Sequence, residues 1–320
     1  MDNIPLVSII MPLYNKRPYV RRAIESIQKQ SYTNWELIIV DDGSTDGSSA
    51  EIPGDEPRIR LFQQENKGPG AARNKGIGMA SGELVTFIDA DDYYYPQKLE
   101  EEMDLLWKRQ EAEWMISAFE CELKNELRLQ HIKDINDNEI KSGLIVFDNA
   151  LKQLTVAGWH IDGLCIKKSL LNRVGGFRED MRYLEITELI IRCASMQPKV
   201  LIYQIPLYRV VDVPNSASKV SSHRNEAARQ MGESLYEMSK FYPEFSNILI
   251  PRSRESLISY AAILILTGKG KEARNFLIND FPYSYNKRWW KMWIGSWIPT
   301  WMLRRLVKTD TDLNQIQQKI

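Results

Sequence analysis

The chain has 320 residues, of which 43% are hydrophobic, and this is enough to bury the core of an α/β domain with a smaller second part. Its 42 basic and 42 acidic residues balance, so we expect no nucleic-acid partner, and any anion or membrane binding has to come from local patches. The three cysteines are widely spaced in apolar surroundings, which is typical of free thiols in a reducing compartment and argues against a zinc site.

Strands and helices alternate in the first 96 residues. Four short buried strands are predicted by apolar runs at 6–11, 36–40, 59–62 and 85–88. Pro18 opens a helix that extends to about residue 30, and a second helix carries Arg73 and Asn74. This alternation predicts an α/β fold with a Rossmann-like, mostly parallel sheet and flanking helices. The first run is too short for a signal peptide or a membrane span, so we expect a cytoplasmic protein.

The pattern becomes less regular after residue 96 and changes again near Pro214. Between these points we expect helices at 97–110, 147–154 and 183–195, and strands at 114–123 and 164–166. The polar stretch 128–142 is predicted to be an insertion. Beyond Pro214 only helical patterns occur, at 225–241, 254–266 and 271–278. We therefore divide the chain into residues 1–96, 97–213 and 214–320, the last of them helical.

Carboxylates follow the fourth predicted strand directly, at Asp89, Asp91 and Asp92. If the strand continues, Asp89 and Asp91 point to the same side, into the crevice where open α/β sheets bind ligands. Two carboxylates that face one crevice repel each other unless a cation or a donor-rich ligand lies between them. Oxygen ligands favour a hard divalent ion, magnesium or manganese. The alternative is a solvated acidic turn that caps the next helix.

Two further strand ends carry polar groups, at Pro12–Asn15 and at Asp41–Asp42. In a parallel sheet these ends line the same crevice and supply a carboxylate for a base N–H and an aromatic ring beside it. Gly68–Gly70 and Arg73 add a close backbone approach and positive charge. The chain has neither G-x-G-x-x-G after its first strand nor a Walker A lysine, which excludes the dinucleotide-binding and P-loop classes.

These segments, in their order and spacing, resemble the motifs of family 2 glycosyltransferases with the GT-A fold. The matching segments are Val7–Asn15, Ile38–Gly47, Asn66–Gly68 with Ala72–Asn74, and Phe87–Asp92. The resemblance covers residues 5–96 and continues more weakly to about 212 through Val174–Phe177. It implies an inverting transfer of a sugar from a nucleoside diphosphate to an acceptor hydroxyl.

The resemblance also implies roles for individual residues. Base and ribose are expected against Pro12, Tyr14, Asp41 and Asp42, with help from Arg73. Lys67, Gly68, Asp89 and Ala90 complete the expected donor-binding set, and a UDP-sugar is favoured as the donor. Asp89 and Asp91 form the D-x-D pair, with Asp91 as the direct ligand of manganese or magnesium. The bound cation would stabilise the leaving diphosphate.

The expected catalytic base is missing from its usual position. The family usually carries a Glu-Asp pair before Leu-x-x-Arg, with the Asp as base, whereas Leu189–Arg192 here follows Glu185-Ile186-Thr187-Glu188. Because Ile186 cannot accept a proton, either Glu185, which we favour, or Glu188 takes the role, or the chain is catalytically impaired. The alternative for both acids is the solvated face of an amphipathic helix. His160 and Asp162 either contact the acceptor or are simply packed.

A segment near the C-terminus, residues 283–308, combines five tryptophans with six lysines and arginines and contains no acid. Tryptophan with flanking cations is typical of a segment that lies in the membrane interface, and Pro299 argues against a span. The alternative is a core-packing helix pair or an oligomer surface. The first interpretation predicts a protein at the inner face of the cell membrane.

Taken together, the sequence predicts a metal-dependent, inverting glycosyltransferase that acts on a surface-polysaccharide or lipid-linked acceptor. A nucleotidyltransferase that makes nucleotide sugars is a rival, but it would favour a G-x-G-x-R-like loop where this chain has Pro12–Asn15. A second rival is a non-catalytic nucleotide-sugar-binding partner of a membrane assembly. Ile186 is the best support for this second rival.

Overall fold

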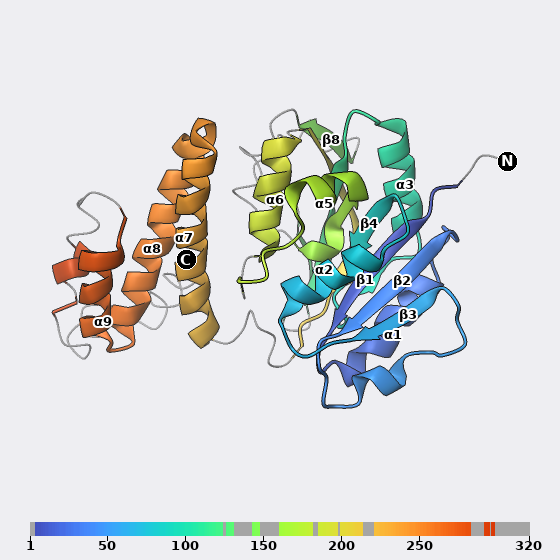
Figure 1. Cartoon of the computed structure of the whole chain (residues 1–320), viewed down its shortest axis with the longest axis horizontal. Coiled ribbons are helices and arrows are strands. Elements are labelled where there is room, and N and C mark those ends of the chain that lie inside the picture. Colours follow the sequence, from blue (N-terminus) through green and yellow to red (C-terminus); the bar gives the residue numbers. More distant parts are fainter. Residues whose placement is uncertain are drawn as a thin grey trace. The chain divides into compact units, whose positions relative to one another are not determined.

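Figure 1 shows the computed structural model of the chain. The structure describes residues 4–123, 126–130, 143–147, 160–181, 185–197, 199–213, 221–282, 291–294 and 296–297. The chain forms two compact units, Met1–Pro214 and Asn215–Ile320. None of the helices in the described ranges is both long enough and apolar enough to cross a membrane.

Within the described residues, a ten-stranded sheet forms the centre of the first unit. Its first half is parallel. Strand β1 (Val7–Leu13) lies between β2 (Trp35–Asp41) and β4 (Leu84–Phe87), and β3 (Ile59–Gln63) pairs with the outer side of β2. Strands β1, β2 and β4 are apolar runs that are buried almost throughout, as expected for parallel strands with helices on both faces.

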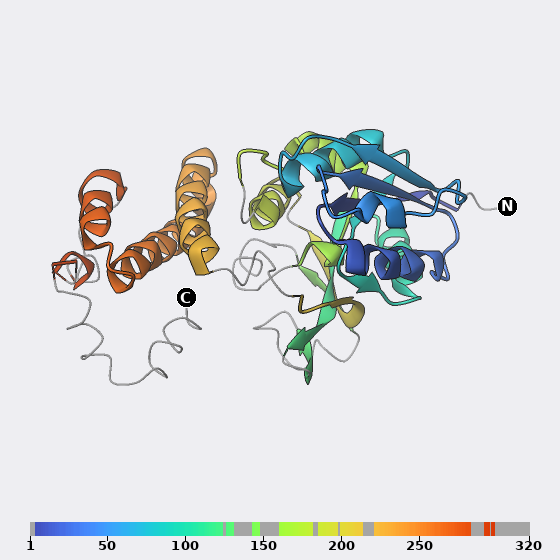
Figure 2. The same cartoon turned by 90° about the horizontal axis from the view of Figure 1, so that it is seen from below.

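Helices α1 (Arg17–Gln28) and α2 (Pro69–Met79) cover opposite faces of β1, and Figure 2 shows them on opposite sides of the strands. Successive side chains of a strand point to opposite faces. The face of β1 that includes Ile9 packs against the apolar side of α1. On the other face, Ile10 meets Gly76, where an added Cβ would lie only 2.5 Å from the Ile10 Cγ2 atom. Helix α2 therefore approaches the sheet closely because Gly76 has no side chain.

The second half of the sheet is mixed. Strand β9 (Leu164–Lys167) runs antiparallel to β4 and to β6 (Trp114–Leu123), and β6 pairs in parallel with β10 (Val200–Val210). Three shorter strands pair with β6 and β10, namely β5 (Tyr93–Tyr94), β7 (Glu126–Gln130) and β8 (Leu144–Phe147). The strand order is β3-β2-β1-β4-β9-β6-β10-β5. The parallel half thus continues into a mixed one at β9.

The remaining helices complete both units. The first unit adds α3 (Lys98–Lys108), α5 (Lys168–Val174), α6 (Glu185–Met196) and 3-10 turns at Ser48–Glu51 and Ile161–Gly163. The second unit contains α7 (Ser221–Phe241), a 3-10 turn at Pro243–Phe245, α8 (Ser246–Leu266), α9 (Gly270–Asn275) and a π-helical turn at Phe276–Asp280. Helices α7 and α8 lie side by side (Figure 1), and the Ser253 hydroxyl donates a hydrogen bond to the Gly232 carbonyl.

The predicted alternation of strands and helices in residues 1–96 is confirmed, with the predicted element ends shifted by at most two residues. Strand β10 was not predicted, because Gln204 and Pro206 interrupt its apolar pattern where its register with β6 shifts. Helix α8 begins earlier than predicted, and Pro251 lies inside it. The helix predicted at 147–154 starts at a residue that ends β8, and residues 148–154 lie outside the described residues. The predicted insertion overlaps β7, and 131–142 also lie outside them.

Candidate functional site

Three loops meet at the carboxyl edge of the parallel strands. Strands β1, β2 and β4 run in the same direction, with Leu13 opposite Asp41 in register. The main-chain N of Asp42 donates to the Leu13 carbonyl at 2.8 Å. The segments that follow these strands therefore leave the sheet at one edge, where α/β folds bind ligands. These are the three segments in which the sequence predicts the site.

The loop after β1 is fixed to the loop after β2 through Asn15. The Asn15 Oδ1 atom accepts a hydrogen bond from the main-chain N of Thr45 at 2.8 Å, and the Asn15 main-chain N donates to Ser44 Oγ at 3.0 Å. Asn15 has φ of 51°, a left-handed conformation that Asn tolerates better than most residues. Pro12 lies within β1, whereas Tyr14 is 48% exposed. The Tyr14 ring is thus accessible to a ligand.

Asp41 is buried and stabilises the turn that follows it. One carboxylate oxygen accepts a hydrogen bond from the main-chain N of Ser44 at 2.8 Å, and the other accepts one from the Ser49 hydroxyl. The turn ahead of the Ser48–Glu51 helical segment is therefore shaped by Asp41 itself. Both oxygens already have a partner in the protein, so the expected contact of Asp41 with a base would have to share one of them.

Asp42 holds the loop that leads into α2. Its Oδ1 atom accepts hydrogen bonds from Gln64 Nε2 at 2.8 Å and from the main-chain N of Lys67 at 2.9 Å. Its Oδ2 atom accepts one from the main-chain N of Gly68 at 2.8 Å. Gly68 has φ of 92°, a conformation in which a side chain would be strained. The expected donor-binding residues Lys67 and Gly68 are thus positioned by Asp42.

A tight turn, rather than a continued strand, positions the acidic residues after β4. The strand ends at Phe87, and the main-chain N of Asp92 donates to the Asp89 carbonyl at 3.0 Å. Ala90 is 2% exposed inside this turn. The argument that strand alternation aligns Asp89 and Asp91 is therefore wrong, and each acid has its own set of partners.

Asp91 contacts cations from the start of α1. The Lys16 ammonium forms a direct ion pair with Asp91 Oδ2, and Arg22 Nη2 donates to the Asp91 carbonyl at 2.9 Å. Both side chains of the ion pair are largely covered, with 27% of Lys16 and 14% of Asp91 exposed. The protein itself thus supplies positive charge to the residue that was expected to be the direct metal ligand.

Arg73 joins Asp89 to Glu185. Its side chain is 3% exposed, with Nη2 at 2.8 Å from Asp89 Oδ1 and Nη1 at 2.9 Å from Glu185 Oε1. Burial alone would raise the pKa of Asp89, but Arg73, followed by His160 and Lys16, holds it below its usual value. Arg73 is therefore a fixed charge between the acidic turn and the N-terminus of α6. Contact with base and ribose, the role expected from the sequence, stays a prediction.

Four side chains form a compact cluster on the other side of the acidic turn. They are Asp89, Asp92, His160 and Asp162, and one potential ligand atom from each lies within 4.8 Å of the others. His160 Nε2 is 3.6 Å from Asp92 Oδ2, and His160 Nδ1 is 3.4 Å from Asp162 Oδ1. Asp162 Oδ1 also accepts a hydrogen bond from the main-chain N of Asp89 at 3.0 Å. The 3-10 turn before β9 thus delivers His160 and Asp162 to the site.

Burial and mutual charge perturb every member of this cluster. Burial raises the pKa of Asp92 well above its usual range, and the nearby Asp162 carboxylate raises it further. Burial also raises the pKa of Asp162, although His160 opposes this shift. For His160, burial acts in the lowering direction, but the surrounding carboxylates raise its pKa to about 10. Around neutral pH the imidazole is therefore a cation held between acids.

The cluster fits a divalent cation. The three carboxylates are ligand types that manganese and magnesium accept, and the His160 imidazole is a ligand for manganese once it has lost its proton. Asp162 Oδ2 is buried and has no hydrogen-bonding partner among the described residues, so one member of the cluster carries an unused acceptor. Of the predicted metal ligands, Asp89 belongs to this cluster, whereas Asp91 pairs with Lys16. The D-x-D prediction for the ligands remains a proposal.

Glu188 forms a separate ion pair on α6. Arg192 Nε and Nη2 lie 2.8 Å and 2.6 Å from the two Glu188 oxygens, and the same guanidinium donates to the carbonyls of Val174 and Gly176. The Leu-x-x-Arg arginine thus links α6 to the end of α5. Glu188, at 5% exposed, takes part in this structural link rather than facing the acidic turn.

The structure brings only one of the two candidate bases to the acidic turn. Glu185 reaches it through Arg73, whereas Glu188 is held by Arg192. The side chain of Ile186, between them, has no atom that accepts a proton. Glu188 would have to give up part of its ion pair with Arg192 in order to take a proton, because both of its oxygens contact that arginine, whereas Arg73 contacts Oε1 of Glu185.

Several residues of the site escaped prediction. Lys16 and Arg22 come after the first strand. They are 75 and 69 residues away from Asp91 in the sequence, so no local pattern could pair them with it. Asp92 was noted as part of the acidic run but not as a cluster member. The available signal for His160 and Asp162 was their spacing of two residues ahead of a short apolar strand, and it did not indicate a metal site.

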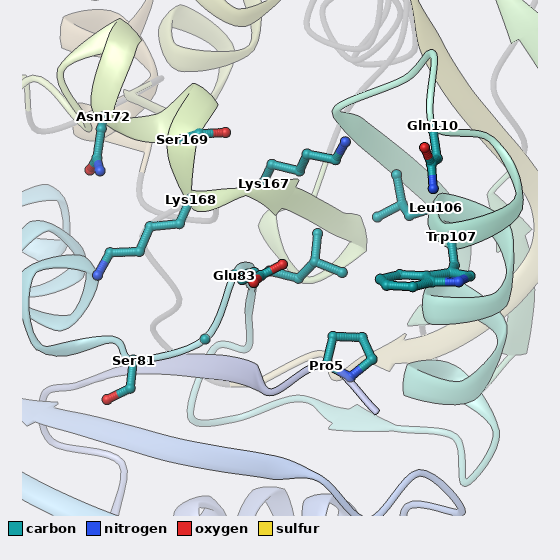
Figure 3. Close-up of a pocket in the computed structure, with 12 residues that line it drawn as sticks. Pro5, Ser81, Glu83, Leu106, Trp107, Gln110, Lys167, Lys168, Ser169 and Asn172 are labelled. Atoms are coloured by element: carbon teal, nitrogen blue, oxygen red, sulfur yellow. The ribbon is translucent and has the colours of Figure 1, made fainter. Parts of the chain in front are cut away.

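A pocket of about 690 Å³ lies at the opposite edge of the sheet (Figure 3). It opens where β4 begins and β9 ends, and Trp107, Lys167 and Glu83 are among its lining residues. None of the predicted site residues lines it. The carboxyl-edge loops, and not this pocket, carry the groups that suit a nucleoside diphosphate.

Comparison with known proteins agrees with this geometry. Residues 8–133 match the family described as Glycosyl transferase family 2. This part of the chain is therefore a domain of the family 2 glycosyltransferase type. An uncharacterized glycosyltransferase of Haemophilus influenzae is 37% identical over 162 residues, which cover 48% of this chain and 58% of the relative. The putative teichuronic acid biosynthesis glycosyltransferase TuaG of Bacillus subtilis is 40% identical over 109 residues, covering 33% of this chain and 43% of TuaG. The chain thus spans about half the length of these curated relatives.

Solved structures show that this chain has the GT-A fold. Staphylococcus aureus TarS 1-349 in complex with UDP-GlcNAc aligns with a TM-score of 0.60 at 16% identity, covering 91% of this chain and 79% of TarS. The mannosyltransferase PcManGT of Pyrobaculum calidifontis, in complex with GDP-Man and Mn²⁺, aligns with a TM-score of 0.56 at 19% identity, covering 92% and 85%. The predicted family and fold class are both confirmed.

Proposed function

We propose that this protein transfers a sugar from a nucleoside diphosphate to an acceptor hydroxyl, with inversion, during synthesis of a surface polysaccharide or a lipid-linked glycan. The observation that carries the proposal is the meeting of the Tyr14, Asp42 and Asp89 loops at one edge of a GT-A sheet. The names of two relatives support the substrate class, since TuaG is assigned to teichuronic acid biosynthesis and TarS was solved with UDP-GlcNAc.

The donor would lie along the carboxyl edge. The exposed Tyr14 ring suits stacking on a base, and the Asp41 and Asp42 loops suit contacts to base and ribose. Asp89 and Asp91, with Asp92, His160 and Asp162 beside them, would hold a manganese or magnesium ion. When bound, such an ion stabilises the charge that develops on the leaving diphosphate. The mannosyltransferase structure with GDP-Man and Mn²⁺ supports this choice of ion.

The proton of the acceptor hydroxyl has to move to a base on the face opposite the leaving group. We favour Glu185 over Glu188 because Arg73 connects Glu185 to Asp89, whereas Glu188 belongs to the link with Arg192. In this role Arg73 would orient the Glu185 carboxylate. The ion pair would then hold Glu185 close to the site where the acceptor attacks.

The first test is a panel of nucleotide sugars that includes UDP-GlcNAc and GDP-Man, with Mn²⁺ or Mg²⁺, read by calorimetric binding and by product analysis. The proposal predicts metal-dependent binding of a subset of donors and free nucleoside diphosphate as the product. Formation of pyrophosphate from a sugar phosphate and a nucleoside triphosphate would instead indicate a nucleotidyltransferase. Absence of metal-dependent binding for every donor would reject the proposed donor class.

A second candidate is a non-catalytic nucleotide-sugar-binding partner within a membrane assembly. It is favoured by Ile186 at the usual base position and by the arginine partners of Glu185 and Glu188. This candidate predicts donor binding without acceptor-dependent release of nucleoside diphosphate. Acceptor-dependent release would therefore remove it.

We also propose contact with the inner face of the cell membrane through residues 283–308. Most of this segment lies outside the described residues. Of the part that is described, Ile294 is 54% exposed and Trp297 is 61% exposed, and the Arg274 guanidinium lies 4.1 Å from the Trp297 ring centroid. Exposed aromatic and aliphatic side chains beside a cation suit an interfacial segment.

A further inference from the structure

We propose that Lys16 is a built-in counter-cation of the Asp89–Asp91 turn, which competes with a divalent cation for Asp91 and then binds the diphosphate of the donor. The first half concerns this chain and a metal ion alone. The second half rests on the proposed function, because it requires a nucleoside diphosphate at the carboxyl edge.

The Lys16 ammonium acts on both acids of the turn. It forms a direct ion pair with Asp91 Oδ2, and it is one of the charges that hold the pKa of Asp89 below its usual value. The ammonium therefore lies against one of the two acids between which the sequence predicts a metal ion. The repulsion between the two acids is therefore already reduced by the protein.

The main chain of Lys16 is fixed, so only its side chain can move. The Lys16 main-chain N donates to Ser48 Oγ at 2.9 Å, and its carbonyl accepts from the main-chain N of Tyr19 at 2.9 Å and of Val20 at 3.0 Å. These contacts hold the residue at the start of α1. The four-carbon side chain remains free to rotate about this anchor, and it is 27% exposed.

Lys16 differs from the other cation of the site in this respect. Arg73 is 3% exposed and uses separate nitrogens for Asp89 and Glu185, so two ion pairs fix the position of its side chain. Among the described residues the Lys16 ammonium forms one ion pair, with Asp91, and it is a point charge without a fixed fork of donors. A divalent cation that uses Asp91 Oδ2 as a ligand needs the oxygen that Lys16 now contacts. Binding of the cation therefore displaces the ammonium but leaves Arg73 in place.

A displaced Lys16 remains next to the leaving group. Its anchor on the β1–α1 loop adjoins Tyr14, and its side chain reaches the turn that would hold the metal-bound diphosphate. A lysine is well suited to neutralise phosphate oxygens as a point charge. Lys16 would thus weaken the binding of a divalent cation alone and strengthen the binding of the nucleoside diphosphate together with the cation.

The test measures Mn²⁺ binding to the full chain without nucleotide, by calorimetry, for the native protein and for Lys16→Gln. Loss of the competing ion pair should tighten Mn²⁺ binding about fivefold. Lys29→Gln is the matched control, because Lys29 lies just after the same helix and pairs with Glu25 at 3.9 Å in an exposed position. The double variant Lys16→Gln/Asp91→Asn should show no gain over Asp91→Asn. Unchanged or weaker Mn²⁺ binding in Lys16→Gln would overturn the competition.

The second arm measures binding of UDP and GDP at saturating Mn²⁺. Here Lys16→Gln should weaken the nucleoside diphosphate that binds the native chain, again by about fivefold. A merely structural role of Lys16 would shift metal and nucleotide binding in the same direction, whereas we expect opposite directions. Unchanged nucleotide binding in Lys16→Gln would refute the diphosphate half. If no nucleoside diphosphate binds even the native chain, the proposed function fails, and the Mn²⁺ arm still decides the competition.

Discussion

At the scale of residues, the site is organised by cations that the chain supplies itself. Lys16 pairs with Asp91, Arg73 pairs with both Asp89 and Glu185, and His160 lies among the remaining acids. Two carboxylates at a strand end are therefore not by themselves proof of a metal site. The stronger indication is Asp162 Oδ2, a buried oxygen without a hydrogen-bonding partner in the described part of the chain.

Changing each of the two candidate bases to glutamine should have different effects on sugar transfer and on stability. Glu185→Gln is expected to abolish most sugar transfer and to leave donor binding intact, because it removes basicity but keeps a hydrogen-bonding group. Glu188→Gln is expected to lower the free energy of unfolding by about 2 kcal/mol, because it weakens a buried ion pair with Arg192. Urea unfolding and a transfer assay on both variants measure the two effects. Near-native transfer in both variants would show that neither glutamate is the base.

The acidic cluster should make the protein less stable as the pH rises. His160 has a pKa of about 10 in the folded chain against 6.5 ordinarily, so its favourable contribution is complete below pH 6.5 and declines toward pH 10. Asp92 and Asp162 act in the same direction. Because their pKa values are raised in the folded chain, their contribution to the free energy of unfolding also declines as the pH rises. Urea unfolding with a chelator between pH 6.5 and 9 should show a falling free energy of unfolding.

In His160→Gln this decline should be shallower, because the group with the largest titration in that range is gone. An identical pH dependence in the native protein and the variant would show that His160 is not held as a cation. Addition of Mn²⁺ in place of the chelator should raise the unfolding midpoint of the native chain if the cluster binds the ion.

At the scale of elements, the close approach of α2 to the sheet determines where Arg73 lies. Gly76 is packed on Ile10, whereas Gly78, in the same helix, has no atom within 4 Å of an added Cβ. Gly76→Ala should lower the free energy of unfolding by about 1–3 kcal/mol through overpacking. Gly78→Ala should leave it unchanged or raise it by up to about 1 kcal/mol, because alanine favours helix.

Thermal or urea unfolding of both variants tests this packing. Equal effects of the two substitutions would contradict the close contact between α2 and β1. Because Arg73 is on α2, the Gly76 variant should also weaken donor binding more than the Gly78 variant does.

The elements that the sequence predicted well are those with a local signal. Strands β1, β2 and β4 are continuous apolar runs, and α1 begins with a proline, so period and boundary residues suffice. Strand β10 was not predicted because Pro206 and two register shifts disturb its apolar pattern. The contacts between the site residues could not be predicted for a different reason. Arg73 and Glu185 are 112 residues apart, and no local pattern encodes such a contact.

At the scale of the whole molecule, the helical second unit is expected to add membrane contact to the GT-A unit. Intact protein should sediment with vesicles that contain anionic lipid, less so at high salt, with about 1 kcal/mol for each cation near the surface. Deleting residues after Phe281 should abolish this binding. Met292 and Trp293 pack against the core of this unit, so Arg304→Gln/Arg305→Gln is the milder variant and should weaken binding without unfolding. No lipid binding by the intact chain at either salt concentration would remove the membrane proposal.

The proposed activity of the whole molecule is sugar transfer at the carboxyl edge of the GT-A unit. The most direct measurement is acceptor-dependent release of nucleoside diphosphate from a nucleotide sugar, with Mn²⁺ and a polysaccharide or lipid-linked acceptor extract. We expect release by the native chain and by Asp104→Ala, a surface acid on α3 that pairs with Lys108. Asp91→Ala should lose about a hundredfold or more in rate while its unfolding stays unchanged. No acceptor-dependent release with any donor, or full activity of Asp91→Ala, would contradict the account.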